Sequence, residues 1–443
     1  MKAKLVPVYF KSTEVPDFAR QLVELKALLT DEAEFLEPVA LGSKIPTSDG
    51  VIFPEMLGAA YRRLEEIQAL PQPIMVVTSE FGTVSMWDWE INSYLTAKGV
   101  RVLAPNTLEK TRQACRALAL KTELKKSKFL VYQDNPASGT GLQDEIFKRF
   151  YWWEPECVAA LEQRFGLKIE KKSFKKLAER AREISDDQAL EVWNQRKKDI
   201  PVSQITSRQV LNAVKQYMQV KRDLDADPTI KAAGMNCLNE SMFSETTPCL
   251  AWNMLYADRK LVWGCEADLI SMLTKVLIAE TIQVPFMMTN LYPFLMGQAA
   301  LKHEHIPEFP DVPGDPRDYI LAAHCGYLGV VPQAFSTEWV LRDKVLAIVD
   351  DNATAIDARL PVGPVTLVKL VPPFDRWTLI EGDLPKYVQY PGSHCLNGAV
   401  LRVPNGPRMV DKMVSHHHIV TTGHNQNALE MVALVFDLES VAV

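Results

Sequence analysis

The stretch 261–290 constrains the fold of this chain more than any other. It opens with a β-type run, continues with the carboxylates Glu266 and Asp268, and then repeats apolar residues at helical spacing. A second β-type run, Val284–Met288, leads to Asn290. Strand, acids, helix, strand and polar residue together predict a site at the carboxyl ends of sheet strands. The alternative is a buried βαβ unit whose acids only cap its helix.

The rest of the chain divides by its pattern of helical and strand-like runs. A length of 443 residues predicts two or three domains. Strands alternate with helices in the first part, which predicts parallel sheets and an α/β fold. Strand-like runs separated by turn formers follow residue 290 and predict a mostly antiparallel β domain, such as a small barrel. We therefore expect an α/β domain over 1–125, a second α/β domain with Glu266 over 126–295, and a β domain with His324 and His417 over 296–443.

Charge and cysteine usage exclude several classes of function. The net charge of -6 gives no electrostatic reason to bind nucleic acid or an anionic membrane surface. No run approaches 18 consecutive apolar residues, and the first residues do not have the pattern of a signal peptide. The seven cysteines are scattered without a CxxC pair. These features predict a soluble, cytoplasmic protein with reduced thiols.

Histidines and oxygen ligands suggest a metal site. All eight histidines lie at or after residue 303, and three are consecutive, at 416–418. Neighbours in a strand point to opposite faces, so at most one or two of these three can be ligands. Glu266, Asn290, His324 and His417 form a mixed oxygen and nitrogen set that suits Mn²⁺ or a related divalent ion. Such a site can polarise a substrate carbonyl and hydroxyl while a carboxylate moves a proton between carbons through an enediol.

Five segments of the second half of the chain occur in this order: PCLAWNMLYADRKLVWGCEADLISMLT at 248–274, LAAHCGYLG at 321–329, GPVTLVKL at 363–370, LIEGD at 379–383 and SHHHIVTTGHN at 415–425. In these segments and their order the sequence resembles the L-fucose isomerase and L-arabinose isomerase superfamily, most closely its fucose-isomerase-like branch. The resemblance implies two N-terminal α/β (Rossmann-like) domains and a C-terminal antiparallel β-barrel domain. It also implies a metal-dependent aldose–ketose isomerase that forms trimers or hexamers, with active sites completed by neighbouring subunits.

Each site residue takes its role from its place in these segments. By resemblance, Glu266 is the metal-binding and proton-transferring glutamate, and His417 is the C-terminal ligand. His324 takes the place of a histidine near the substrate or metal, and Trp87 lies in a segment that lines the pocket of an adjacent subunit. Asn290 departs from the pattern, because fucose isomerases have a metal-binding aspartate at this position.

The departure at Asn290 has a chemical consequence. An amide oxygen can coordinate, but it brings no charge and cannot accept a proton at neutral pH. Asn290 is therefore expected to be a weak third ligand. Asp268 is a poor substitute, because in a helical first turn it points roughly 200° away from Glu266. Glu240, near the end of the preceding strand, is the better supplementary acid.

Other functions remain open at this stage. A relative with the same fold that binds a carbohydrate or catalyses another reaction is the main alternative, because of Asn290. A scaffold without activity is a further possibility. A hydrolase with Cys325 as nucleophile is disfavoured, since strand neighbours face opposite sides and His324 is badly placed to act as its base. Trp87 and Trp89 are candidates for a sugar-stacking surface or, alternatively, for core or interface anchors.

Overall fold

The computed structural model describes residues 2–134, 150–303, 308–324, 331–346, 349–390 and 397–443. The chain forms two compact units. The first unit contains residues 1–125, 280–283 and 427–440, and the second contains 126–279, 284–426 and 441–443. Each unit is described below by itself.

The first unit is an α/β layer built on a parallel sheet, as the alternation of strands and helices predicts. Its strands lie in the order β2-β1-β4-β5-β6, and β3 pairs with β1. Two short helices, η1 and α2, lie between β4 and β5. The strands are β1 (Ala3–Tyr9), β2 (Ala33–Phe35), β3 (Val39–Ala40), β4 (Gly50–Phe53), β5 (Ile74–Val76) and β6 (Val102–Leu103). The helices are α1 (Pro16–Leu28), η1 (Gly58–Arg62), α2 (Leu64–Gln68), η2 (Met86–Asp88), α3 (Trp89–Ala97), α4 (Leu108–Leu124) and most of α15 (Gln426–Phe436).

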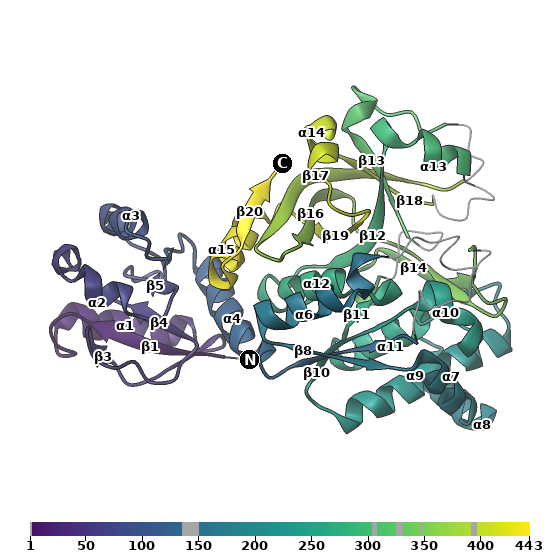
Figure 1. Ribbon diagram of the computed structural model, residues 1–443, viewed down its shortest axis with the longest axis horizontal. Helices are drawn as coiled ribbons and strands as arrows, with labels where there is room; N and C mark the ends of the chain where they lie inside the picture. The colour runs from purple at the N-terminus through teal and green to yellow at the C-terminus, as the bar shows by residue number, and fades with distance from the viewer. Residues whose placement is uncertain (1, 135–149, 304–307, 325–330, 347–348, 391–396) are drawn as a thin grey trace. The chain divides into compact units, whose positions relative to one another are not determined.

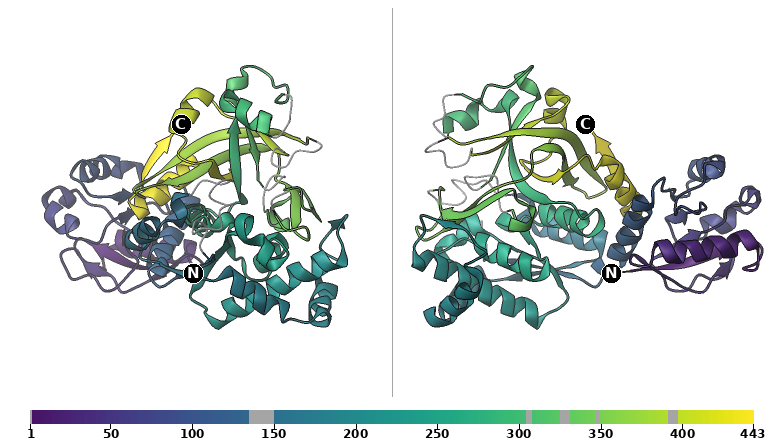
Figure 2. Two further views of the ribbon diagram at one scale, coloured as in Figure 1. Left: turned by 45° about the vertical axis from the view of Figure 1, so that its right-hand side comes forward. Right: turned by 180° about the vertical axis from the view of Figure 1, so that it is seen from behind.

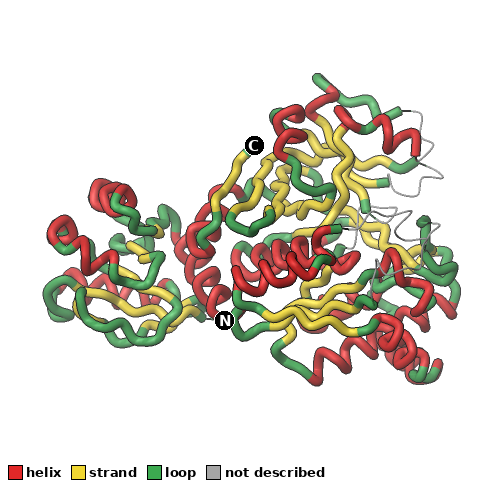
Figure 3. Tube along the Cα trace, in the orientation of Figure 1, coloured by secondary structure: helices red, strands yellow, loops and turns green. Residues whose placement is uncertain are grey.

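The second unit begins with another parallel sheet, in the order β11-β10-β7-β8, with helices beside it (Figure 3). The Ser185 and Thr206 side chains begin two of these helices with capping boxes. The strands are β7 (Lys128–Tyr132), β8 (Lys168–Lys172), β10 (Ile230–Met235) and β11 (Val262–Gly264). The helices are η3 (Tyr151–Trp153), α6 (Pro155–Phe165), α7 (Phe174–Arg182), α8 (Asp186–Arg196), α9 (Ser207–Ala226), α10 (Cys237–Ser244) and α11 (Cys249–Arg259).

A closed antiparallel barrel of six strands forms the other part of the second unit (Figure 1). The strands follow the order β16-β19-β12-β13-β18-β17, and pairing of β17 with β16 closes the ring. Figure 2 shows these strands, green to yellow, curving around one another in both views. The predicted β-barrel is therefore confirmed. The barrel strands are β12 (Phe286–Pro293), β13 (Tyr319–Ala323), β16 (Gly363–Val371), β17 (Arg376–Val388), β18 (Gly398–Arg402) and β19 (His417–Thr422).

Smaller elements connect these layers. β14 and β15 are consecutive strands along the chain. They form a small sheet in the order β15-β14-β9. These elements are β9 (Val202–Ser203), η5 (Phe294–Met296), α13 (Gln298–His303), η6 (Pro316–Asp318), η7 (Gln333–Phe335), β14 (Glu338–Asp343), β15 (Thr354–Arg359) and α14 (Gly406–Lys412). Residues 441–443 belong to the second unit and include the end of β20 (Glu439–Ala442). There the backbone N–H of Val443 donates to the carbonyl oxygen of Leu379 on β17.

The stretch 261–290 connects the parallel sheet to the barrel. β11 is an edge strand of the sheet, whereas β12 is a barrel strand between β19 and β13. The interpretation of this stretch as two strand ends of one parallel sheet is therefore wrong. Helix α12 (Leu269–Thr281) runs between the two layers in Figure 1. Glu266 therefore lies where the end of a sheet strand meets a barrel.

Two glycines bring the sheet edge close enough for this arrangement. Gly234 on β10 is paired with Gly264 on β11. A Cβ atom at Gly234 would lie 2.8 Å from the carbonyl oxygen of Gly264, a contact that real Cβ atoms do not make. The strand that carries the chain to Glu266 therefore requires glycine beside it.

Candidate metal centre

Glu266 lies in a tight turn, not in the first turn of a helix. The turn is η4 (Cys265–Ala267), and it follows β11 directly. Glu266 has a φ of 54° and Ala267 has a φ of 52°, both in the left-handed region. Such a conformation costs about 1–2 kcal/mol for each residue that has a Cβ atom. Helix α12 begins only at Leu269, so the prediction of both acids in its first turn is wrong.

Two adjacent tryptophans hold this turn. The indole Nε1 of Trp153 donates to the carbonyl oxygen of Glu266 at 2.9 Å, and that of Trp152 donates to the same oxygen at 3.3 Å. Both tryptophans are buried in η3. The ring of Trp152 also stacks on His417, with centroids 4.9 Å apart. Trp152 therefore contacts both the backbone of Glu266 and the ring of His417.

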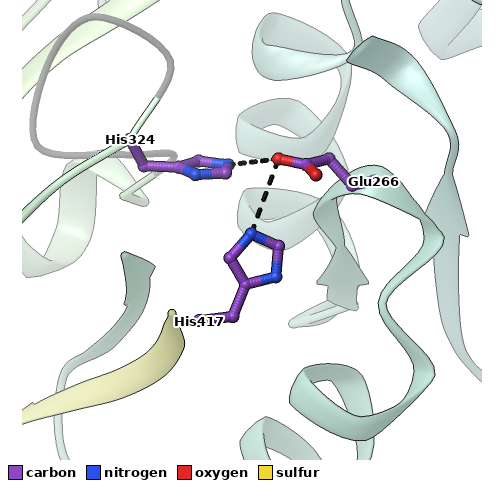
Figure 4. Close-up of side chains that lie close together, drawn as sticks. All are labelled: Glu266, His324 and His417. Carbon is purple, nitrogen blue, oxygen red and sulfur yellow. Dashed lines mark ion pairs between the residues drawn. The ribbon is translucent and has the colours of Figure 1, made fainter. Parts of the chain in front are cut away.

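The side chains of Glu266, His324 and His417 converge. The Nε2 of His417 lies 3.6 Å from Glu266 Oε1, and the Nε2 of His324 lies 4.0 Å from the same oxygen. Figure 4 shows both interactions ending on one carboxylate oxygen. One ligand atom from each residue lies within 4.8 Å of the other two, so the group can hold a metal ion. All three side chains are buried, and neither Nε2 has a hydrogen-bond partner in the described part of the chain.

Asp268 fixes the orientation of His417. Its Oδ2 lies 2.9 Å from His417 Nδ1, so a proton on Nδ1 leaves the lone pair of Nε2 directed toward Glu266. The same carboxylate accepts hydrogen bonds from the Ser271 hydroxyl and backbone N–H and from the Lys369 ammonium group. A carboxylate behind a metal-binding histidine is a common arrangement in metal sites. Asp268 precedes α12 and caps it. The expectation that Asp268 points away from Glu266 is therefore wrong, because it assumed that both residues lie in a helical turn.

Asn290 contacts the far side of His324. It lies opposite His417 on β19 and opposite Ala323 on β13, which places its side chain beside the next residue, His324. Asn290 Oδ1 is 3.2 Å from His324 Nδ1, and Asn290 Nδ2 is 3.3 Å from the hydroxyl of Tyr292. Asn290 was predicted as a metal ligand, but in this structure its amide oxygen contacts the histidine ring.

The three consecutive histidines have different surroundings, as the alternation of side chains along a strand predicts. Within the described residues, only His417 of the three joins the group with Glu266. His416 packs against the rings of Phe150 and Trp152, with centroids 5.4 and 6.0 Å away. His418 is buried in the barrel, and neither of its ring nitrogens has a hydrogen-bond partner among the residues described.

The charges in the site suit a cation. Burial raises the pKa of Glu266, but His417 and His324 outweigh it and hold this pKa at about 2. Burial also acts to raise the pKa of Asp268, and Lys369 and His417 hold it well below its usual range. Burial lowers the pKa of His324 to about 3, against the attraction of Glu266. At neutral pH the group therefore offers ionised carboxylates and a neutral imidazole, the forms that bind metals.

His417 differs from His324 in its protonation. Burial acts to lower the pKa of His417, but Glu266 and Asp268 together raise it above the usual value. A proton on this ring is thus shared between two carboxylates. A divalent cation at the site would compete with that proton, so metal binding is expected to release it.

Two further residues predicted for the site have other surroundings. Glu240 is buried in α10, where its carboxylate accepts hydrogen bonds from the backbone N–H of Asp134 and the side-chain amide of Asn236. Trp87 belongs to the first unit and is 80% exposed, and Trp89 is also exposed, so neither is a core residue there. Cys325 lies outside the described residues.

Several residues around the site were not singled out from the sequence. Trp152, Trp153, Ser271 and Lys369 all contact the group or its supporting carboxylate. The adjacent tryptophans just before Pro155 were the available signal, because such large side chains are rarely placed together without a packing role. Lys369 had a weaker signal, a single lysine inside the apolar run of GPVTLVKL.

Comparisons with known proteins do not identify the chain. No protein-family model matches it, and no curated protein does. None of the helices in the described ranges combines the length and apolar character needed to cross a bilayer. The chemistry of the site therefore carries the functional argument. Once His417 has released its proton, one carboxylate and two imidazoles can bind a divalent ion and leave positions open for substrate oxygens.

Proposed function

We propose that this chain is a metal-dependent aldose–ketose sugar isomerase of the fucose-isomerase-like type. The observation that carries the proposal is the convergence of Glu266, His417 and His324 on one buried point. The order of family-like segments along the sequence supports it independently. A divalent cation such as Mn²⁺ bound there would supply Lewis-acid polarisation of a substrate carbonyl and hydroxyl.

The residues of the chain divide the remaining work. His417 and His324 approach Oε1 of Glu266, and we assign proton transfer to its other oxygen, Oε2. In this scheme Oε2 takes a proton from the carbon next to the substrate carbonyl and returns it to the former carbonyl carbon. The hydroxyl proton of the neighbouring carbon passes to the former carbonyl oxygen, so that aldose becomes ketose through an enediol. Asp268 keeps His417 in the required tautomer, and the tryptophan pair keeps the Glu266 backbone in its turn.

We also propose that the enzyme is a cytoplasmic homo-oligomer. Cys115, Cys157, Cys237, Cys249 and Cys265 carry free thiols, consistent with a reducing compartment. Phe81, Met86, Trp87 and Trp89 are exposed apolar side chains within one short segment of the first unit, a feature typical of interaction surfaces. This supports the trimer or hexamer expected from the resemblance, with Trp87 and neighbouring side chains contributing to the sugar site of another subunit. Light scattering on the purified protein tests the oligomer.

Activity on a panel of aldoses and ketoses, with divalent ions added one at a time, tests the proposed reaction. We expect ketose formation that is lost on chelation, restored by metal, and abolished in Glu266→Gln. Glu240→Gln, which alters a buried glutamate with other partners, should retain activity. Full activity after chelation and dialysis would contradict the metal mechanism.

A second function is favoured by Asn290. Its amide contacts His324 and supplies no second carboxylate for proton transfer. A protein with the same fold that binds a carbohydrate, or catalyses a different reaction on one, fits this observation. If the parent protein converts no sugar on the panel while Asn290→Asp does, this alternative is the correct one.

A further inference from the structure

The contact between Asn290 and His324 determines which nitrogen of this histidine is free. An amide oxygen only accepts hydrogen bonds, so the 3.2 Å contact from Asn290 Oδ1 places the proton of a neutral His324 on Nδ1. The lone pair is then on Nε2, which is buried, has no partner in the described ranges and lies 4.0 Å from Glu266 Oε1. A buried nitrogen left without a partner is unfavourable, and a bound cation would remove this cost.

The two histidines are held in the same way from opposite sides. Asp268 lies behind Nδ1 of His417, and Asn290 lies behind Nδ1 of His324. In both cases a side-chain oxygen contacts Nδ1 of the histidine, and Nε2 then faces Glu266. This is the role of residues that orient metal-binding histidines without touching the metal.

From this symmetry we propose that Asn290 is a positioning residue for His324 and not a metal ligand, and that the site prefers a borderline cation, Zn²⁺ foremost, to Mn²⁺ or Mg²⁺. The inference rests on the proposed metal site and names the ion that it takes. Imidazole nitrogens suit zinc and iron, whereas manganese and magnesium favour carboxylate and carbonyl oxygens. A set of one carboxylate and two imidazoles has lost one of the oxygen ligands that favour manganese.

The spacing of the ligand atoms agrees with this preference. Two ligands at about 2.05 Å from a tetrahedral ion lie about 3.4 Å apart. Adjacent ligands of an octahedral ion at the same distance lie about 2.9 Å apart. The 3.6 Å separation between Glu266 Oε1 and His417 Nε2 is nearer to the tetrahedral value. Three protein ligands with an open fourth position form the usual catalytic zinc site.

Metal titrations of the full-length protein test the proposal. Dissociation constants for Zn²⁺ and Mn²⁺ would be measured by competition with a chromophoric chelator for the parent, His324→Gln, Asn290→Ala and Asn290→Asp. His424→Gln is the matched control, because the His424 ring contacts the carbonyl oxygen of Gly382 and lies outside the group. The visible spectrum of the Co²⁺-loaded protein reports the coordination number, since four-coordinate Co²⁺ absorbs much more strongly than six-coordinate Co²⁺.

We expect Zn²⁺ to bind at least about 100-fold more tightly than Mn²⁺, with the intense Co²⁺ bands of a four-coordinate site. His324→Gln should weaken Zn²⁺ binding by more than about 100-fold, and Asn290→Ala by about 10–100-fold. Asn290→Asp should leave the ratio of the Zn²⁺ and Mn²⁺ dissociation constants unchanged. The new carboxylate would contact Nδ1 of His324, as the amide oxygen does in the parent, and would not bind the metal. His424→Gln should bind like the parent.

Three results would overturn the proposal: unaltered Zn²⁺ binding in His324→Gln, weak six-coordinate Co²⁺ bands, or a selective tightening of Mn²⁺ binding in Asn290→Asp by about tenfold or more. The last result would make residue 290 a ligand. Failure of the isomerase proposal is a separate outcome. If the protein binds Zn²⁺ as expected but converts no sugar, the ion preference holds and the isomerase proposal fails. If the protein isomerises a sugar with Mn²⁺ and His324→Gln has no effect, the isomerase proposal holds and the ion preference fails.

Discussion

Glu240 and Glu266 are two buried glutamates of the second unit with different surroundings. Their exposed fractions are 3% and 5%, so burial does not distinguish them. The Glu240 carboxylate accepts hydrogen bonds from a backbone N–H and a side-chain amide. One oxygen of Glu266 instead faces two imidazole nitrogens that have no hydrogen-bond partner among the described residues.

In the proposed function Glu266 is the functional acid and Glu240 a structural one, and their surroundings differ accordingly. Glu240 accepts from neutral donors that hold a loop and a helix start together, which satisfies a buried carboxylate. Glu266 sits in a strained turn, and the ring nitrogens around it are oriented by other residues. Strain and unpaired polar atoms that are supported by their surroundings are typical of functional sites.

The largest expected effect separates these two glutamates directly. Glu266→Gln should weaken divalent-metal binding by more than about 100-fold, because it removes the charged ligand from the group. Glu240→Gln should leave metal binding unchanged and lower the free energy of unfolding by about 0.5–1.5 kcal/mol, because an amide still accepts one hydrogen bond. Titration calorimetry and urea unfolding measure the two quantities. Equal metal affinities in the two variants would remove the distinction.

Asp268→Asn tests whether the orientation of His417 matters. We expect metal binding to weaken by about 10–100-fold, because the amide directs His417 less strongly and leaves the buried Lys369 without a charged partner. Ser271→Ala is the control, since it removes one hydrogen bond to Asp268 but leaves the contact with His417. A smaller loss in Asp268→Asn than in Ser271→Ala would contradict the orienting role.

His418, which lies next to His417, is expected to make the stability of the protein depend on pH. Burial lowers the pKa of His418 to about 3, and Lys369 and His417 act in the same direction. The unfolded chain binds a proton near the ordinary value of about 6.5. The unfolded state therefore takes up the proton first, and stability contributed by this residue falls as the pH drops from 6.5 toward 3.

His418→Phe should reduce this acid sensitivity. The expected change in slope is about 1.4 kcal/mol per pH unit between pH 6 and pH 4. Urea unfolding of the metal-free protein at several pH values measures it. His424→Phe, which alters a histidine whose ring contacts the carbonyl oxygen of Gly382, is the control for the loss of a ring. An identical slope in the parent and in His418→Phe would contradict the prediction.

The smallest effect concerns the turn itself. Trp153→Phe removes one donor to the Glu266 carbonyl and should lower the free energy of unfolding by about 1 kcal/mol, because Trp152 still donates to that oxygen. The double variant with Trp152→Phe should lose more than the sum of the single losses, since the carbonyl then has no indole donor. Additive losses in urea unfolding would show that the two indoles act separately.

The sequence predicted the architecture well where periodicity was strong. Alternating strands and helices identified the α/β character, and closely spaced strand-like runs identified the barrel. The pairing of distant strands could not be read in this way. The run Val284–Met288 looks like a parallel core strand, and only its partners β13 and β19 show that it belongs to the barrel.

The site was predictable in its residues more than in their roles. The order of family-like segments singled out Glu266, His324 and His417. The roles of Asp268 and Asn290 depended on backbone details that spacing does not contain: a left-handed turn at Glu266 and the register of β12 against β13 and β19. Trp152 and Trp153 lie more than a hundred residues before Glu266, and nothing local links them to it.

Anomalous diffraction from crystals grown with Zn²⁺ tests the central claim most directly. The account predicts one strong peak at the zinc absorption edge, within bonding distance of Glu266 Oε1, His324 Nε2 and His417 Nε2. Asn290 should remain on Nδ1 of His324, away from the peak. A peak elsewhere in the molecule with this group empty, or no peak at all, would contradict it.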